Sequence, residues 1–354
     1  MALDAECRPA RPVELASGID ALYLSGRAEI PSVLFDDLDV LRAMAAADGK
    51  PAGWQLGGTA VEVLGRNFGK YRYALRHELA LIGITPSEKL PSIRVQPTSI
   101  ALHALGPAGT VLWVRNIFEA VGIDVRLQVA RLDLHSDWQG FWIEPDERRS
   151  FVTYSDRRSL YEVSDELSGL NFGKRGGAVY ARIYDKTREL DGKGDDWLQE
   201  LWGPAYDPEQ RVLRVEFEFS RDGLREFEVD TPEDAFAHVG ALWAYATGSW
   251  LSLRRPTDDD TRSRWPIDSR WEAVQRSALA NNSLPASRIR SGAHAGSLRR
   301  LMPQLVGYLA SAAVHLGTAT VADTTHALHP LIDAYGNQAG ITFTERVDEK
   351  RHRA

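Results

Sequence analysis

Three segments of the chain alternate apolar and polar residues with the two-residue period of a β-strand. They span residues 126–138, 178–186 and 211–220. Each has one mainly apolar face and one ionisable face. The ionisable faces hold Arg131, Asp133, His135 and Asp137 in the first segment, Tyr180, Arg182, Tyr184 and Lys186 in the second, and Arg214, Glu216 and Glu218 in the third. The pattern therefore predicts three strands that each present a row of reactive side chains.

The rest of the pattern predicts helices and shorter strands. Apolar residues recur at intervals of three and four, as in amphipathic helices, over 32–47, 110–123, 157–169, 233–253, 301–316 and 319–336. Gly169 is expected to cap the third of these helices. Alternating runs predict strands at 59–65 and within 71–84 and 91–106, where Pro97 indicates an edge strand or a bulge.

These elements suggest four parts of the chain. We expect an N-terminal helical segment over 1–50, a domain carrying the three segments over 51–253, an Arg-rich linker or DNA-contacting arm over 254–300, and C-terminal helices with a tail over 301–354. Within 254–300, ten arginines oppose four aspartates and one glutamate. Such a stretch can follow DNA phosphates, or it can be a solvated linker whose charges pair among themselves.

Composition narrows the class of protein. The 354 residues are 44% hydrophobic and 26% charged, which is ordinary for a soluble globular protein with a buried core. Cys7 is the one cysteine, so an internal disulfide and a CxxC zinc site are excluded. The sequence predicts no signal peptide and no membrane helix, and we expect a cytoplasmic location. The net charge of −7 argues against a general nucleic-acid binder but allows a site-specific one.

The ionisable faces have an inert interpretation and a chemical one. Antiparallel sheets commonly have one solvated face. If the three strands are neighbours, however, they bring together acids that can hold Mg²⁺ or Mn²⁺, cations that can hold phosphate, and a tyrosine nucleophile. The metal would polarise a phosphodiester. A neighbouring Arg or Lys would lower the pKa of the tyrosine from about 10.

The three segments, RLDLHSDW, GLNFGKRGGAVYARIYDKTRE and VLRVEFEF, resemble in order and spacing the three blocks of the replication initiation factor family. This family comprises rolling-circle plasmid initiators of the staphylococcal tetracycline-plasmid type and related relaxases of conjugative elements. The resemblance covers about residues 55–250. The positions that match the family pattern are Arg131, Asp133, Arg182, Tyr184, Lys186, Glu189, Arg214 and Glu216. Asn171 and Phe172 stand before Gly173, where many members have a tyrosine.

The resemblance implies an α+β fold related to the HUH endonucleases, with a central antiparallel sheet flanked by helices; here a C-terminal helical extension follows. It implies site-specific nicking and rejoining of DNA through a covalent phosphotyrosine, which initiates rolling-circle replication of a plasmid or mobile element. By position, the nucleophile is Tyr184, with Tyr180 as the alternative. Arg182 and Lys186 would hold phosphate or tune the tyrosine. The implied metal ligands for Mg²⁺ or Mn²⁺ are Asp133 and Glu216, with Glu218, His135 and Asp137 as lesser candidates.

The expected partners are origin DNA, supercoiled or single-stranded, and a host helicase and polymerase, with a homodimer as the oligomer considered and no membrane. Three alternatives stay open. The protein could be a relaxase for conjugative transfer, an origin or promoter DNA-binding protein of the same fold without catalysis, or a metal-dependent phosphodiesterase that uses water.

Overall fold

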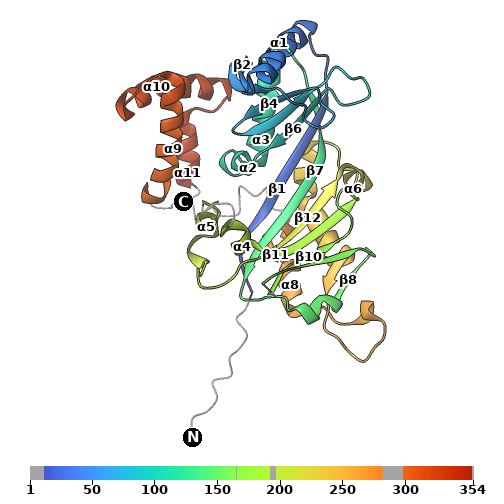
Figure 1. Ribbon diagram of the computed structural model, residues 1–354. Helices are drawn as coiled ribbons and strands as arrows, with labels where there is room; N and C mark the ends of the chain where they lie inside the picture. Colours follow the sequence, from blue (N-terminus) through green and yellow to red (C-terminus); the bar gives the residue numbers. More distant parts are fainter. Residues whose placement is uncertain (1–11, 165, 192–196, 282–297, 353–354) are drawn as a thin grey trace. The chain divides into compact units, whose positions relative to one another are not determined.

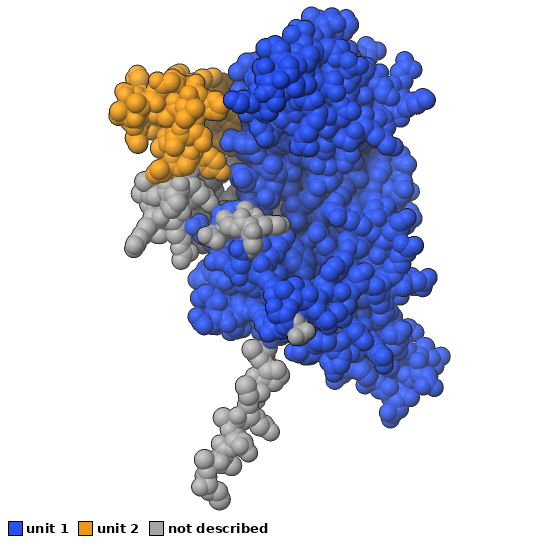
Figure 2. Space-filling model, in the orientation of Figure 1, with its two compact units in different colours: residues 1–289 blue, residues 290–354 orange. Residues whose placement is uncertain are grey.

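The computed structural model describes residues 12–164, 166–191, 197–281 and 298–352 (Figure 1). They form two compact units, Met1–Ile289 and Arg290–Ala354, by their internal contacts (Figure 2). The first unit is built on one sheet of eleven strands in the order β2-β3-β4-β5-β6-β1-β7-β12-β11-β10-β9. Every neighbouring pair is antiparallel. The strands are β1 (Val13–Arg27), β2 (Ala52–Leu56), β3 (Thr59–Leu64), β4 (Tyr73–His77), β5 (Ala80–Ile84), β6 (Ile93–Pro97), β7 (Arg126–Gln139), β9 (Arg158–Val163), β10 (Glu166–Phe172), β11 (Val179–Asp185) and β12 (Leu213–Ser220).

The three predicted strands are confirmed and lie side by side as β7, β12 and β11 (Figure 1). Their apolar faces enter the main core, where Phe217 packs edge-on against Trp243 and Trp250 at centroid distances of 5.5 and 6.3 Å. Burying such side chains contributes on the order of 2 kcal/mol each. Since the apolar face is fixed in the core, the ionisable residues of all three strands must share the opposite face.

Helices cover the sheet along its length. The helix α1 (Ser32–Asp48) contacts β2 and β3, and α2 (Ser99–Ala104) contacts β1 and β6. The helices α6 (Arg221–Glu226) and α7 (Pro232–Ala244) contact β7. Thr231 begins α7 with a capping box, in which its hydroxyl accepts from the Asp234 N–H and the Asp234 carboxylate accepts from the Thr231 N–H. The remaining helices of this unit are α3 (Gly106–Glu119), α4 (Lys186–Asp191), α5 (Trp197–Trp202) and α8 (Ser269–Gln275). The predicted α+β class with helices flanking an antiparallel sheet is confirmed.

The N-terminal segment differs from the expected helical one. The helix is present as α1, but it is preceded by β1, a strand of 15 residues at the centre of the sheet, between β6 and β7. Register shifts interrupt the pairing of β1 with β7 at three places, between Glu14 and Ala16, between Ile19 and Ala21, and between Tyr23 and Leu24. Two of these shifts insert a residue in β1, Leu15 and Asp20, and break its two-residue alternation, which hides the strand in the sequence. The third inserts Ala130 in β7.

The predicted helix over 157–169 is wrong. These residues form β9 and the start of β10, which pair as a hairpin at the edge of the sheet. Ser164 turns the chain with a φ of 56°. Beyond Gly173, whose φ is 94°, a turn leads into β11. Pro97 is the last residue of β6, an interior strand, so the expectation of an edge strand there is also wrong.

The described part of the expected linker, up to residue 281, is folded into the first unit. Just before this stretch, the strand β13 (Leu251–Leu253) pairs with β8 (Phe151–Thr153) in a separate two-stranded sheet, and within it Arg254 bridges with Ile267. Trp271 and Val274 of α8 are buried in the core. Residues 282–297 of the predicted arm lie outside the described residues.

The second unit contains the two predicted C-terminal helices, α9 (Leu298–Leu316) and α10 (Val321–Gln338), and a third helix, α11 (Phe343–His352), in place of a frayed tail. Within the described residues no single helix is both long and apolar enough to cross a membrane, although the bent pair Leu305–Leu316 and Val321–Gln338 passes by length and composition.

Candidate active site

The pairing register aligns the ionisable residues of β11, β12 and β7 in three cross-strand rows. Directly opposed residues of an antiparallel pair lie close together on one face of the sheet. The rows are Tyr180–Glu218–Asp133, Arg182–Glu216–His135 and Tyr184–Arg214–Asp137. The eleven residues of the predicted ionisable faces, which include all nine predicted site residues, lie on these strands or, in the case of Lys186, one residue beyond β11. Most of them are buried, so this face is not a solvated surface.

Arginines pair with the carboxylates at one end of this face. Arg131 donates from Nε and Nη2 to the two oxygens of Asp133, and its Nη2 lies 2.9 Å from Glu218 Oε2. Arg182 donates to Glu216 Oε1. Burial, opposed by Arg131 and reinforced by the charges of Glu216 and Glu218, raises the pKa of Asp133 to about 7. Negative charge is thus in excess here despite the arginines.

Tyr184 lies within hydrogen-bonding distance of a carboxylate. Its hydroxyl donates to Glu216 Oε2 at 3.1 Å, while Arg182 occupies the other oxygen of the same group. Burial and the charge of Glu216 raise the pKa of Tyr184 well above its usual value. The expectation that Arg182 or Lys186 lowers this pKa is therefore wrong. Both cations lie over the ring, at 5.8 and 5.9 Å from its centroid, but neither offsets burial.

Glu216 has the properties of a proton acceptor. Burial and the negative charge of Asp20 raise its pKa, against the opposing charges of Arg182 and Arg214. A carboxylate with a raised pKa holds a proton more strongly than an ordinary one, which suits a general base. The Tyr184 hydroxyl donates its hydrogen bond to this carboxylate, so Glu216 is placed to accept the proton of that hydroxyl.

The third row is a buried ion pair. Arg214 donates to both oxygens of Asp137, from Nε at 2.6 Å and from Nη2 at 2.8 Å, and Trp202 Nε1 donates to Asp137 Oδ2 at 2.8 Å. Asp137 is 0% exposed and the charge of Arg214, against burial, lowers its pKa. Asp137 lies within the strand, which continues to Gln139. Its oxygens are occupied, which argues against a role as metal ligand.

Asp20 belongs to the site and was not predicted. It is the residue inserted by the bulge between Ile19 and Ala21, and its Oδ1 accepts from Arg214 Nη1 at 2.7 Å. Although burial acts to raise it, the charge of Arg214 holds the pKa of Asp20 well below its usual range. Asp20 is the one charged residue between Glu14 and Arg27. This isolation is the signal that could have identified it.

His135 is buried, and its Nδ1 has no hydrogen-bond partner among the described residues. That nitrogen lies 3.9 Å from Asp20 Oδ1. Burial, reinforced by the charge of Arg214, lowers the pKa of His135 to about 3, so the imidazole is neutral at pH 7. His103 of α2 also contributes to this region and was missed; burial lowers its pKa to about 4.

The donor set has the chemistry of a divalent cation site. Carboxylates in excess and an unpartnered neutral imidazole are ligands that Mn²⁺ accepts, and the carboxylates suit Mg²⁺. In the described part of the chain, however, no three His, Cys, Asp or Glu side chains are grouped so that they could hold a metal ion. Arg131 and Arg182 engage the carboxylates instead. The fit is therefore one of donor chemistry and not of a preformed site.

Tyr180 and Lys186 lie at the two ends of the set of ionisable residues along β11, on either side of Arg182 and Tyr184. Tyr180 is 9% exposed, and burial and the nearby Tyr161 raise its pKa. Lys186 lies beside Glu189, with Nζ 2.5 Å from Oε2. Glu189, the acid that matches the family pattern, is thus the partner of Lys186. Neither residue contacts Glu216 as Tyr184 does.

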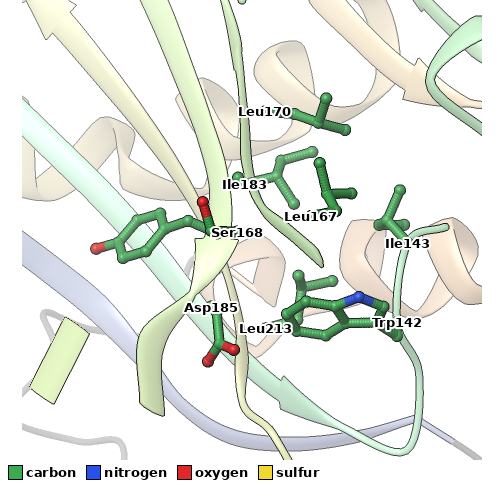
Figure 3. A pocket seen from close by; sticks show the side chains of 10 residues that line it. Trp142, Ile143, Leu167, Ser168, Leu170, Ile183, Asp185 and Leu213 are labelled. Carbon is green, nitrogen blue, oxygen red and sulfur yellow. The ribbon is translucent and has the colours of Figure 1, made fainter. Parts of the chain in front are cut away.

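A small pocket lies close to the tyrosine strand but does not form the site. Apolar side chains line most of it, among them Trp142, Leu167 and Ile183 (Figure 3). Its volume is about 10 Å³, which holds at most one water molecule. The pocket is therefore too small to hold a nucleotide.

Comparisons with known proteins add a resemblance. No family model matches the chain, and no curated protein matches it. It is similar to the solved structure of a rolling circle replication initiator protein from Geobacillus stearothermophilus, with 15% sequence identity and a TM-score of 0.45, over 74% of this chain and 97% of that chain. Similarity at this level assigns no role to any residue, so residue roles come from the geometry of the site.

Proposed function

We propose that the protein nicks and rejoins DNA at a specific site through a covalent phosphotyrosine on Tyr184. The observation that carries this proposal is the hydrogen bond from the Tyr184 hydroxyl to Glu216, at 3.1 Å, with Arg182 on the same carboxylate. A nucleophile, a base and a phosphate-binding cation thus converge within one row and its neighbour.

The chain's own residues account for the proton and the charge. Glu216 takes the hydroxyl proton as the Tyr184 oxygen forms a bond to phosphorus, and the bond from phosphorus to the leaving sugar oxygen breaks. That sugar oxygen takes a proton from solvent water, and the phosphotyrosine conserves the energy of the broken strand. Rejoining is the same sequence reversed. Arg182, released from Glu216 as the carboxylate becomes protonated, is free to bind the non-bridging oxygens.

A divalent cation is part of the proposal. Asp133 would hold it, with Glu218 and His135 as further ligands and Asp20 as an addition that the fold supplies; Glu216, the other ligand expected from the sequence, serves in this scheme as the base instead. When bound, Mg²⁺ or Mn²⁺ would polarise the phosphodiester and offset charge in the transition state. The unpartnered Nδ1 of His135 beside Asp20 supports this assignment.

The wider role that we propose is initiation of rolling-circle replication of a plasmid or mobile element, with origin DNA as substrate and a host helicase and polymerase acting downstream. Conjugative transfer would use the same chemistry. The DNA that surrounds the gene separates these roles, because an adjacent hairpin origin favours replication and adjacent conjugation genes favour transfer.

The test uses a supercoiled plasmid that carries the DNA flanking the gene, with Mg²⁺ or Mn²⁺. We expect nicked plasmid and a protein–DNA adduct that survives denaturing electrophoresis. Tyr184→Phe should abolish the adduct and Tyr180→Phe should retain it. Glu216→Gln should slow adduct formation by about 10²- to 10⁴-fold, the usual contribution of a general base.

Other outcomes would contradict the proposal in distinct ways. Nicks without an adduct would indicate hydrolysis by water. Metal-independent origin binding without nicking would indicate a DNA-binding protein. An adduct that survives Tyr184→Phe but not Tyr180→Phe would indicate that Tyr180 is the nucleophile.

A further inference from the structure

The strand β9 forms one edge of the eleven-stranded sheet, and its outer side is open. It pairs with β10, and in the part of the chain that the structure describes no further strand follows it in the sheet. Five of its six residues are exposed, and the sixth, Leu160, packs partly against the main core. An open edge presents unpaired backbone groups to which another strand can add.

The backbone groups that point outward belong to alternate residues of β9. The N–H of Gly173 donates to the carbonyl of Arg157 at 3.0 Å, which continues the ladder between β10 and β9. Backbone groups along an antiparallel strand face its two sides alternately. Since Arg157 faces β10, the next residue and every second one after it face away. The hydrogen-bonding groups of the open edge are therefore those of Arg158, Leu160 and Glu162.

The opposite edge of the sheet is protected in ways that β9 is not. Pro51 precedes β2, Gly53 lies within it, and α1 contacts it. Proline, glycine and a covering helix all disfavour the addition of a further strand. β9 contains neither proline nor glycine, and its register shift with β10 inserts a residue in β10. Among the described elements, β10 is the one that packs extensively against β9.

Two side chains of opposite charge flank the centre of the open edge. Arg158 and Glu162 each stand two residues from Leu160, so they share its face of the sheet. The guanidinium of Arg158 lies over Phe172, 5.9 Å from the ring centroid. Within the described residues neither Arg158 nor Glu162 has a partner of opposite charge. Burial, together with the like charge of Arg262, lowers the pKa of Arg158, so a carboxylate beside it would stabilise the charged guanidinium.

We propose that two copies of the chain associate through β9, which pairs antiparallel with itself across a two-fold axis at Leu160. In this register Leu160 opposes the partner's Leu160, and Arg158 opposes the partner's Glu162 on both sides of the axis. Directly opposed residues of unlike charge stabilise an antiparallel pair, whereas like charges destabilise it. A parallel arrangement would set Arg158 against Arg158 and is disfavoured for that reason. The sheet then runs continuously through both copies.

The symmetry of the edge favours a second copy over a strand of unrelated sequence. An isologous interface must satisfy each group twice, because the same surface is used by both copies. Reversing β9 about Leu160 exchanges the positions of Arg158 and Glu162, which meets this condition. The three outward-facing residues then bond to the same three residues of the partner, so the groups that the edge leaves open are used. Five strand spacings, roughly 24 Å, would separate the two copies of Tyr184.

The test measures the mass of the full chain by sedimentation equilibrium over a range of protein concentrations. The parent should show a monomer–dimer equilibrium. Arg158→Glu and Glu162→Arg each set like charges against one another at two positions of the dimer, and each should weaken association roughly 10- to 100-fold. Arg157→Glu is the matched control, because its side chain is exposed one residue away and opposes Val163 in this register. It should dimerise like the parent.

Mixing the two charge variants tests the register itself. A copy with Arg158→Glu carries two acids on the edge, and a copy with Glu162→Arg carries two bases. The two copies are complementary at both positions, so an equimolar mixture should associate with about parental affinity although neither variant does so alone. A chain with both substitutions restores the pair within one sequence and should also dimerise.

Three results would overturn the inference. A parent that stays monomeric at every concentration would leave the edge for a strand of another protein. A dimer that both charge variants leave unchanged would place the interface on another surface. A mixture of the charge variants that stays monomeric would refute the register. Circular dichroism checks that each variant is folded. No DNA or metal enters these measurements, so their outcome is independent of the proposed chemistry.

Discussion

The buried pair of Arg214 and Asp137 should anchor the centre of the sheet, and Arg214→Met measures how strongly. The guanidinium is 1% exposed and makes three hydrogen bonds, two to Asp137 and one to Asp20. Methionine has a similar length and no charge. It leaves Asp137 fully buried with Trp202 as its remaining side-chain donor. Removing one partner of a buried pair costs about 3–5 kcal/mol, because the other charge stays uncompensated.

The assay is urea unfolding followed by tryptophan fluorescence. All ten tryptophans lie between Trp54 and Trp271, so the signal reports the first unit alone. Arg211→Met is the control, since Arg211 and Glu166 are 47% and 54% exposed and such a pair contributes about 0–1 kcal/mol.

A second variant tests the cause of the loss. In Arg214→Met with Asp137→Leu, both members of the fully buried pair are apolar, and part of the stability should return, since replacing a buried pair by apolar groups is often near neutral. Asp20, which is 27% exposed, and Trp202 Nε1 still lose their partners in this variant. The reasoning is refuted if Arg214→Met costs no more than Arg211→Met, or if the double variant is less stable than the single one.

Three further predictions follow from the site. The folded-state pKa values of Asp20 and Asp137 lie below their ordinary ones, so their stabilising contribution is present above about pH 4 and is lost as the pH falls through the folded-state values; acid titration of the midpoint in urea should show this loss, reduced in Arg214→Met. Gly169→Ala should slow adduct formation while single-strand binding is kept, because the new Cβ meets Tyr184 Cβ at 3.1 Å; an unchanged rate would show that the backbone gives way. Removing metal with a chelator should stop nicking, and added Mn²⁺ should restore nicking and raise the melting temperature of the protein. Full activity in the presence of chelator would show that Arg131 and Arg182, and not a metal, offset the charge of the transition state.

The sequence predicts the three site strands correctly because burial of one face imposes a two-residue period on their apolar side chains. Leu132 and Leu134, and likewise Val215 and Phe217, enter the core, so their neighbours are fixed on the other face. Which strands are neighbours does not follow from alternation. The register that opposes Arg182 to Glu216 is set by pairing across 34 residues, and a slip of one residue would have moved every side chain to the other face.

The failures have local causes. In 157–169, Leu160, Val163 and Leu167 are spaced by three and four, which imitates a helix. The segment is an exposed edge hairpin, so burial does not impose a clean alternation on it. In β1 the bulges shift the apolar residues from one parity to the other. The same bulge that hides the strand carries Asp20 into the site, and sequence alternation cannot identify a residue whose position depends on breaking the alternation.

The inert interpretation, in which these residues form the solvated face of an antiparallel sheet, is wrong because their side chains are buried. Asp133, Glu216 and Arg214 are each 1% exposed, and His135 is 3% exposed. Taking such groups out of water costs several kcal/mol per ion, and apolar residues of similar volume would stabilise a sheet as well or better. Stability alone therefore does not explain this set. Burial, reinforced by neighbouring carboxylates, raises the pKa values of Asp133 and Glu216, and a face in that state would gain most from an arriving cation or from the proton that we propose Tyr184 gives up. Both events belong to phosphoryl transfer, and neither would benefit a purely structural sheet.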